Sequence, residues 1–242
     1  MRKGFHEPVE KPRRFYKVVE VAPVDGGFAL TLDGRRLRTP KGRALALPTR
    51  ALAGLVAEEW AAQGQTIEMA DMHATRLANT AVESIPGARP ETAAQVANYA
   101  ASDLVCYFAE GPESLVVRQE EGWGPLLERA RRDVELAFVR AQGIVHQPQP
   151  EATLAKVREL ALGLDDFGLA GLAFGAALFG SAVLGIAVAR GWLTAEQAFE
   201  LSRLDESWQE EQWGVDEEAA LRTARMRTEA QMLERWFRAL EG

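Results

Sequence analysis

Cysteine and histidine are scarce in this chain of 242 residues, and their scarcity excludes several classes of protein. Cys106 is the only cysteine, so the chain forms no internal disulfide and no thiolate metal cage. It lies in the apolar run DLVCYF, which predicts a buried, unreactive thiol. The three histidines, His6, His73 and His146, belong to no metal-binding motif. We therefore expect no metal site and a reducing compartment.

Nucleotide-binding and nucleophile motifs are also missing. The chain has no GxxxxGK(S/T) phosphate loop, and the glycines at 168, 171 and 175 lie in an apolar helical pattern rather than after a strand. Gly180-Ser181-Ala182 lacks the second glycine of a nucleophile elbow. We therefore predict no cofactor and no enzymatic activity. The enzymatic alternative is a carboxylate-dependent hydrolase that uses the acidic residues of 205–218.

Basic residues are concentrated at the start of the chain. Residues 1–50 contain twelve Lys/Arg and five Asp/Glu, a charge of +7, so the net charge of −7 leaves −14 for the remainder. An acidic majority argues against a nucleic-acid binder, because phosphate contacts need a clustered basic surface. We expect no nucleic-acid partner.

One long uncharged run, Phe167 to Ala189, extends over 23 residues, which is enough to cross a bilayer. It is rich in glycine and alanine, which favours two short, closely packed helices bent near Gly180. We predict a buried helical hairpin, with a membrane-associated scaffold as the alternative. The segment MRKGFHEPVEKPRRFYK lacks the apolar core of a secretory signal and contains acids that mitochondrial presequences avoid. A cytoplasmic location without stable membrane insertion is expected.

Periodicity and turn residues predict an α+β fold, with a small antiparallel β-rich domain and one helix in residues 1–88 and a helical bundle in residues 89–242. Asp25-Gly26-Gly27 and Asp33-Gly34 have the composition of hairpin turns. Thr49 can cap the first helix, which ends near Gly64. The expected strands are 15–21, 28–32, 35–38 and 44–47, and the later helices are 74–85, 91–109, 123–142, 151–163, 194–213 and 216–241.

The last helix has the cleanest apolar pattern. Its side chains alternate steps of four and three residues over three heptads. This seam favours packing within the bundle, with a coiled-coil dimer as the alternative, and we expect the free chain to be a monomer. The seam consists of Ala219, Thr223, Met226, Ala230, Leu233, Phe237 and Leu240.

The segment from Asp205 to Glu218 (DESWQEEQWGVDEE) holds seven carboxylates, two tryptophans and no basic side chain. In one continuous helix, Trp208 would point into the core. A flat aromatic beside acids suits a basic protein surface, whereas the alternative is a solvated acidic face. The side chains that one helix would group within about 40° are Glu206, Glu210, Trp213 and Glu217.

Seven segments resemble, in order, the "ATP-twelve" assembly chaperones, which serve the F-type ATP synthase in mitochondria and related bacteria. The match covers about residues 13 to 220, and His73 stands where the family usually has proline. The segments are RRFYKVVEV, LDGRRLRTP, PTRALAGLVAEEWAAQG, MHATRLANTAVE, YAASDLVCYFAE, WGPLLE and LDESWQEEQWGVDEEA.

The resemblance implies a chaperone task. Family members bind the newly made α subunit of the catalytic head and shield its subunit-facing surface until a β subunit replaces the chaperone. Glu206 and Glu210 are then expected to meet Arg or Lys of the α subunit, with Trp213 as the apolar anchor. The missing presequence implies a bacterial member. From the LDExxQxxxWG pattern and the helix face together, the expected partner-binding residues are Glu206, Gln209, Glu210, Trp213, Gly214 and Glu217.

Three polar or glycine positions have a structural interpretation that we favour. Gln209 and Gly214 can serve to end one helix and start the next, with Asp216 as the N-cap of the second. Asp103, in YAASDLVCY, is expected to form a buried hydrogen bond to a neighbouring helix rather than a partner contact.

Overall fold

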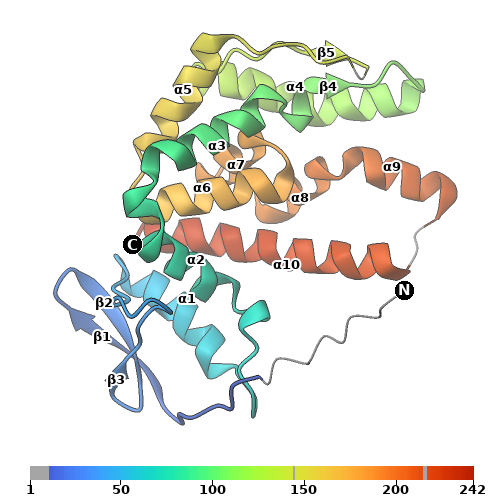
Figure 1. Ribbon diagram of the computed structural model, residues 1–242. Coiled ribbons are helices and arrows are strands. Elements are labelled where there is room, and N and C mark those ends of the chain that lie inside the picture. Colours follow the sequence, from blue (N-terminus) through green and yellow to red (C-terminus); the bar gives the residue numbers. More distant parts are fainter. Residues whose placement is uncertain (1–10, 144, 215–216) are drawn as a thin grey trace, which may run out of the picture.

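The computed structural model describes residues 11–143, 145–214 and 217–242. At one end of the molecule, three short strands lie beside α1 (Arg50–Ala61), and most of the remaining chain is helical (Figure 1). The fold is α+β, as the sequence predicts.

The N-terminal sheet is built on two tight turns. β1 (Val19–Val24) pairs antiparallel with β2 (Gly27–Leu32), which pairs antiparallel with β3 (Arg35–Arg36). Asp33 has a φ of 48°, as its hairpin turn requires. β1 begins later than predicted because the Asp33 carboxylate accepts the N–H groups of Lys17 and Val18 at 3.0 and 2.8 Å.

The predicted third and fourth strands are shorter than expected. β3 ends at Arg36, and residues 44–47 contribute only isolated bridges to the strand region. The chain between them closes a turn of its own, in which the Gly42 N–H donates to the Thr39 carbonyl at 2.8 Å. Backbone groups used in this turn are not available to a ladder.

The first helix forms as predicted. The Thr49 side chain accepts the N–H of Leu52 at 3.0 Å, and the apolar face of α1 is buried against the sheet. The later helices are α2 (His73–Glu83), α3 (Arg89–Ala101), α4 (Glu113–Val134), α5 (Glu151–Leu162), α6 (Asp166–Phe179), α7 (Ala182–Ala189), α8 (Ala195–Ser202), α9 (Leu204–Trp213) and α10 (Glu217–Leu240).

Two helices have boundaries that differ from the prediction. α3 ends at Ala101 because Asp103 caps the 3-10 turn η3 (Leu104–Cys106), after which β4 (Tyr107–Phe108) pairs in parallel with β5 (Ala141–Gln142). α4 begins at Glu113 rather than at 123, and it ends at Val134 because Glu135 adopts the left-handed conformation, with a φ of 59°. Two-residue strands have no periodicity for a sequence pattern to detect.

The glycine-rich hairpin lies within the helical part, as predicted. Gly180, with a φ of 64°, ends α6, and α7 is buried from Ala182 to Val188. A Cβ at Gly185 would lie only 3.1 Å from the backbone nitrogen of Ala176, so the two helices meet through glycine. None of the helices in the described part of the chain combines the length and apolar character that a bilayer-spanning segment needs.

α10 connects the sheet end with the helical part. It packs along α6 and α8, and the Thr49 hydroxyl donates to the carbonyl of Ala239 near its end. α2 contacts both α1 and α6. One continuous core contains residues from both parts, and the domain boundary at residue 88 stays a prediction.

Candidate functional site

The acidic segment begins after a break that the sequence pattern did not show. α8 ends at Ser202 and α9 begins at Leu204, with Arg203 between them at φ −118° and ψ 20°. The Ser202 hydroxyl donates to the Phe199 carbonyl at 2.7 Å, a local bond that competes with the helical pattern. The predicted helix 194–213 is therefore two helices.

A second break follows at Gly214. Its φ of 86° and ψ of 171° end α9, and its N–H donates to the Glu210 carbonyl at 2.8 Å. This conformation favours glycine, so the structural interpretation of Gly214 is confirmed. The one continuous helix on which the four-residue face depended does not form, because α9 and α10 are separate helices, but Glu206, Glu210 and Trp213 all belong to α9. The predicted N-cap Asp216 and the side chain of Glu217 lie outside the described residues.

The two tryptophans of α9 contact each other. Trp213 is 77% exposed, and its ring lies edge-on to that of Trp208, with centroids 6.2 Å apart. Trp208 is half-buried, and α9 contains no fully buried residue, so the expectation that Trp208 anchors the core is wrong. Leu201 and Leu204 instead pack on α4, where Gly122 leaves room for them. The tryptophan pair is thus accessible on the outer part of α9.

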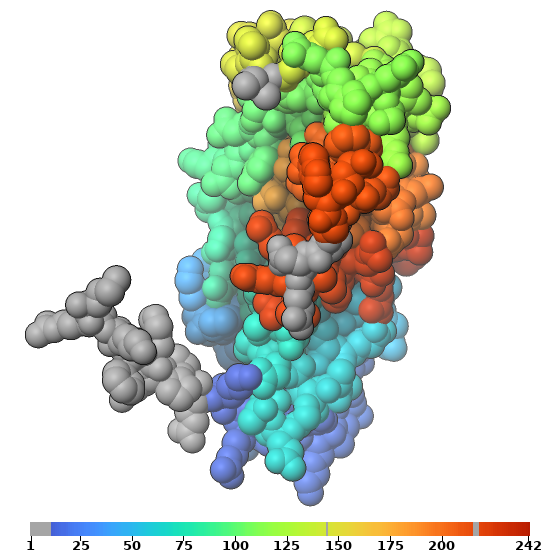
Figure 2. Space-filling view, turned by 90° about the vertical axis from the view of Figure 1, so that its right-hand side faces the viewer, coloured from blue at the N-terminus to red at the C-terminus, as the bar shows by residue number. Residues whose placement is uncertain are grey.

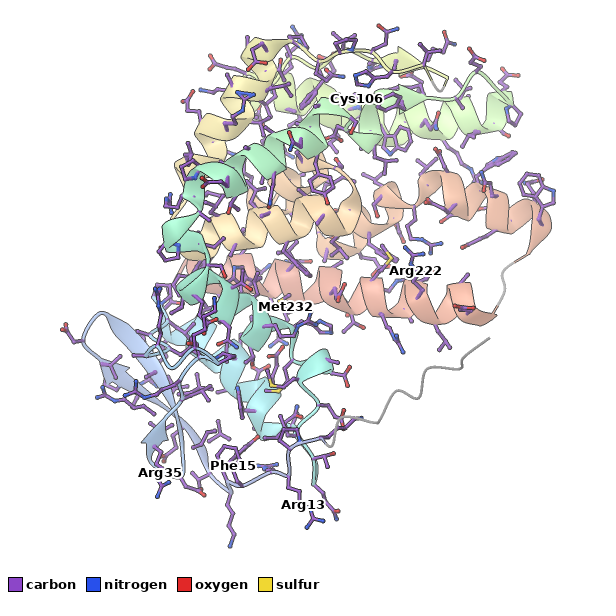
Figure 3. The ribbon with its side chains drawn as sticks, in the orientation of Figure 1. Arg13, Phe15, Arg35, Cys106, Arg222 and Met232 are labelled. Carbon is purple, nitrogen blue, oxygen red and sulfur yellow. The ribbon has the colours of Figure 1, made fainter. Side chains whose placement is uncertain are left out.

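A groove of about 870 Å³ lies between α9 and the N-terminal half of α10, and we call it the α9–α10 groove. Glu206 and Glu210 line it from α9, Arg222 and Met226 from α10, and Leu178 from α6. In Figure 2, α9 lies between α4 above it and the first turns of α10 below it. Figure 3 shows Arg222 in the space between α9 and α10. The expected acids therefore stand on the wall of a concave site.

Three acids of α9 are engaged by neighbours that hold the helix in place. The Arg118 guanidinium lowers the pKa of Glu211 through its hydrogen bonds, and burial raises the pKa of Asp205. Because Glu210 is ion-paired and half-buried, it fixes Arg203 beside the groove. The contacts are Glu210–Arg203 at 2.6 Å, Glu211–Arg118 at 2.7 Å and Asp205–Gln119 at 2.7 Å.

Glu206 differs from these three acids. It is exposed on the groove and, among the described residues, forms no ion pair; the same holds for Glu218 at the start of α10. Gln209 is exposed in the middle of α9, where it caps neither end of the helix, so its expected helix-ending role is wrong. Of the expected contact residues, Glu206, Gln209 and Trp213 are the three whose side chains are described as exposed.

The apolar seam of α10 divides into two parts. Ala230, Leu233 and Phe237 are buried in the bundle, as predicted, whereas Thr223 and Met226 line the α9–α10 groove. Sequence reasoning did not assign a binding role to the N-terminal half of the seam. The heptad spacing of the seam could have indicated this role, because a seam that continues beyond the bundle exposes an apolar surface, and such surfaces are often binding sites.

Asp103 is buried next to the α9–α10 groove, between two residues that line it. It is fully buried, its carboxylate accepts the Ser181 hydroxyl at 2.5 Å and the Val183 N–H at 3.1 Å, and its neighbours Ser102 and Leu104 line the groove. The expected bond to a neighbouring helix is confirmed, because both partners belong to the N-terminus of α7. Burial raises the pKa of Asp103 to about 7. Cys106, in the adjoining turn, is buried as predicted, and burial also raises the pKa of its thiol.

The raised pKa of Asp103 predicts a pH-dependent stability. In the unfolded chain this carboxyl ionises near 3.8, so the folded protein binds the extra proton between pH 3.8 and about 7. Its contribution to stability is fully present below pH 3.8 and is lost as the pH rises through 7, with a slope of at most about 1.4 kcal/mol per pH unit. Asp103→Asn removes this slope and keeps an acceptor for Ser181.

Urea unfolding of both proteins from pH 4.5 to 8 measures the effect. The exposed acids titrate alike in both, so the difference between the two curves isolates Asp103. The wild-type protein should lose stability relative to Asp103→Asn as the pH rises. Parallel curves over this range would contradict the assignment.

A family model of the ATP12 chaperone protein matches residues 13–131. The crystal structure of Atp12 from Paracoccus denitrificans is 40% identical in sequence and superposes with a TM-score of 0.87, covering 94% of this chain and 98% of that chain. The chain belongs to the ATP12 chaperone family.

Two further similar proteins extend the comparison. The Atu1473 protein of Agrobacterium tumefaciens is 38% identical, with a TM-score of 0.90, covering 95% of this chain and 86% of that chain. Protein atp12 of Schizosaccharomyces pombe, a mitochondrial protein, is 26% identical over 226 residues, or 88% of this chain and 78% of that protein. The chain is an ATP12 chaperone for ATP synthase assembly, as the sequence resemblance implies.

Proposed function

We propose that this ATP12 chaperone binds the unassembled α subunit of the F-type catalytic head at the α9–α10 groove and releases it when a β subunit takes its place. The observation that carries the proposal is the combination of an exposed indole, Trp213, with an open groove that has an apolar floor and, on its wall, Glu206, an acid with no ion pair in the described part of the chain. Large accessible aromatics beside complementary charges are typical of protein-binding surfaces.

The site residues take different roles in this proposal. Trp213 provides the apolar anchor, and Glu206 meets an Arg or Lys of the α subunit. Glu210 holds Arg203 on the groove wall through their 2.6 Å ion pair, so it acts on the partner through Arg203 as much as directly.

Replacement of the chaperone by a β subunit is favoured by a groove that is partly apolar and partly polar. An interface made for a stable hexamer is large and apolar, so an unassembled subunit exposes a surface that promotes aggregation. The chaperone contact must be weaker than the final one. A site with few aromatic anchors and a polar wall meets that condition, because affinity depends on such anchors more than on area.

A carboxylate-dependent hydrolase is the second candidate, favoured by the position of Glu206 and Glu210 on one groove. Hydrolysis by two acids needs both carboxyl groups to be available to the substrate. The Glu210 carboxylate is already engaged by Arg203, which favours the chaperone role.

The cytoplasmic location that the sequence predicts stays a prediction.

The test of partner choice is size-exclusion chromatography with light scattering. The chaperone is mixed separately with isolated α and β subunits of the same bacterium. A complex with α alone that dissociates when β is added is the expected result. A complex with β alone, or with neither subunit, would overturn the proposal.

Glu206→Lys is expected to weaken α-subunit binding by about tenfold at low salt, since it places like charges opposite each other at the contact. Because Glu206 is exposed, the melting temperature should stay within about 2 °C of the wild type. The matched control is Glu20→Lys, which makes the same charge change on the exposed side of β1, away from the groove. Equal effects of the two variants on binding would show that only net charge matters.

A further inference from the structure

The outer face of α6 has an apolar stripe. Ala170, Ala173, Phe174, Ala177 and Leu178 recur at helical spacing and lie on one side of the helix. The opposite side, with its glycines, packs against α7 and the C-terminal half of α10. Figure 1 shows α6 lying between α3 and α10, and it contacts both helices.

This stripe joins two grooves. Ala170, Ala173 and Phe174 line a groove of about 450 Å³ between α2, α3 and α6, and Ala177 and Leu178 line the α9–α10 groove. We call the two grooves together the α6 channel. Residues 173 and 174 of the first groove neighbour 177 and 178 of the second on one helix face, so the two grooves lie one after the other along α6, although no residue lines both.

The walls of the α6 channel continue in the same way. On α3, Thr92 and Gln95 line the first groove, and Ser102, just after the helix, lines the second. On the other side, His73 of the first groove contacts Glu229 of α10 at 3.4 Å, and Met226, one turn earlier on α10, lines the second groove. Both walls therefore lie alongside the part of α6 that lines the two grooves.

We infer that the α6 channel receives one amphipathic helix of the unassembled α subunit, lying along α6. The inference rests on the proposed function and names the kind of element that the site binds. The apolar stripe of that helix packs on the alanines of α6, which leave room for large side chains such as leucine or phenylalanine.

The channel walls favour a helix over an extended segment. Most of the lining residues belong to α-helices, whose backbone N–H and C=O groups are largely bonded within each helix. An extended segment would enter without partners for its own backbone groups, which is costly in a desolvated groove. A helix bonds its own backbone and needs only side-chain contacts.

The charges of the channel specify the flanks of the bound helix. At the α9 end, two exposed acids, Glu206 and Glu218, have no ion pair among the described residues and outnumber the exposed Arg222, so the excess negative charge favours Lys or Arg on the helix there. Arg76 is exposed at the α2 end and favours an acidic side chain or the helix C-terminus. The occupant is thus an amphipathic helix that is basic at one end.

Ala173→Trp tests the inference, because the new side chain fills the first groove without changing the acids of the α9–α10 groove. Binding of the isolated α subunit, measured by isothermal titration calorimetry, is expected to weaken by about tenfold or more. The matched control, Ala155→Trp, adds the same side chain at an exposed position of α5 that lines neither groove, and should bind within about twofold of the wild type.

A second measurement does not depend on how Ala173→Trp folds. Benzoylphenylalanine is introduced at the exposed Ala177, the complex with the α subunit is irradiated, and the adduct is identified by mass spectrometry. A cross-link to an amphipathic helix of the α subunit supports the inference, and a cross-link to an extended segment overturns it.

The outcomes separate the inference from the proposed function. If Glu206→Lys loses binding while Ala173→Trp binds as the wild type does, the channel inference is wrong and the proposed function stands. If the α subunit does not bind the wild-type protein, both are wrong. If light scattering shows a dimer of the chaperone alone that Ala173→Trp dissociates, the occupant is a second copy of this chain and the inference is overturned.

Discussion

Trp236→Ala is expected to lower the free energy of unfolding by about 3–5 kcal/mol, the usual cost of emptying a large buried aromatic site. The indole is fully buried, and its Nε1–H donates to the Phe167 carbonyl at 3.1 Å. It also fits against Gly171, where a Cβ would lie 2.9 Å from Nε1. Alanine leaves a cavity between α6 and α10 and removes the hydrogen bond from the indole to the Phe167 carbonyl.

Trp213→Ala is the matched control, since it removes the same side chain from an exposed site. With 77% of Trp213 exposed, the stability change should stay below about 1 kcal/mol, whereas α-subunit binding should weaken. Urea denaturation followed by circular dichroism gives both stabilities. Similar losses for the two variants would contradict the assignment of Trp236 to the core and Trp213 to the surface.

Gly185→Val is expected to destabilise the protein by about 3 kcal/mol or more. A Cβ at this position would lie 3.1 Å from the Ala176 nitrogen and 3.4 Å from the Gly175 carbonyl carbon. The obstacle is the α6 backbone, which cannot rotate away as a side chain can. Valine adds two further methyl groups, so α6 and α7 must separate, and overpacking of this kind costs about 1–3 kcal/mol and sometimes more.

Gly54→Val provides the comparison for this substitution. Gly54 also lies inside a helix, but a Cβ there meets no atom within 4 Å. Valine has a higher helix propensity than glycine, so this variant should be neutral or slightly stabilising. Thermal melting of the two variants measures the difference. A Gly185→Val protein as stable as Gly54→Val would show that α6 and α7 do not need close contact.

Both substitutions would also affect the proposed binding site. Trp236 and Gly185 fix the inner side of α6, and the outer side of the same helix is the floor of the α6 channel. A displaced α6 changes the channel even though neither residue lines it. Loss of binding in these variants should therefore accompany loss of stability, whereas Glu206→Lys should separate the two.

The sequence alone determined the features that depend on neighbouring residues. Asp33-Gly34 specified a hairpin because its backbone readily adopts positive φ, and Thr49 capped α1 through a bond within three residues. The heptad seam placed the second half of α10 in the core. The order of the seven segments, together with LDExxQxxxWG, indicated the chaperone family.

Only the tertiary structure decided how these features meet. The acids of α9 share a composition, yet Arg118, Gln119 and Arg203 engage three of them and leave Glu206 exposed. The exposure of the first half of the α10 seam in the groove follows from packing between residues far apart in the chain. Local patterns fix backbone preferences over a few residues. Burial and charge pairing depend instead on which distant segments come together, and the helical or strand periodicity of one sequence does not show which segments those are.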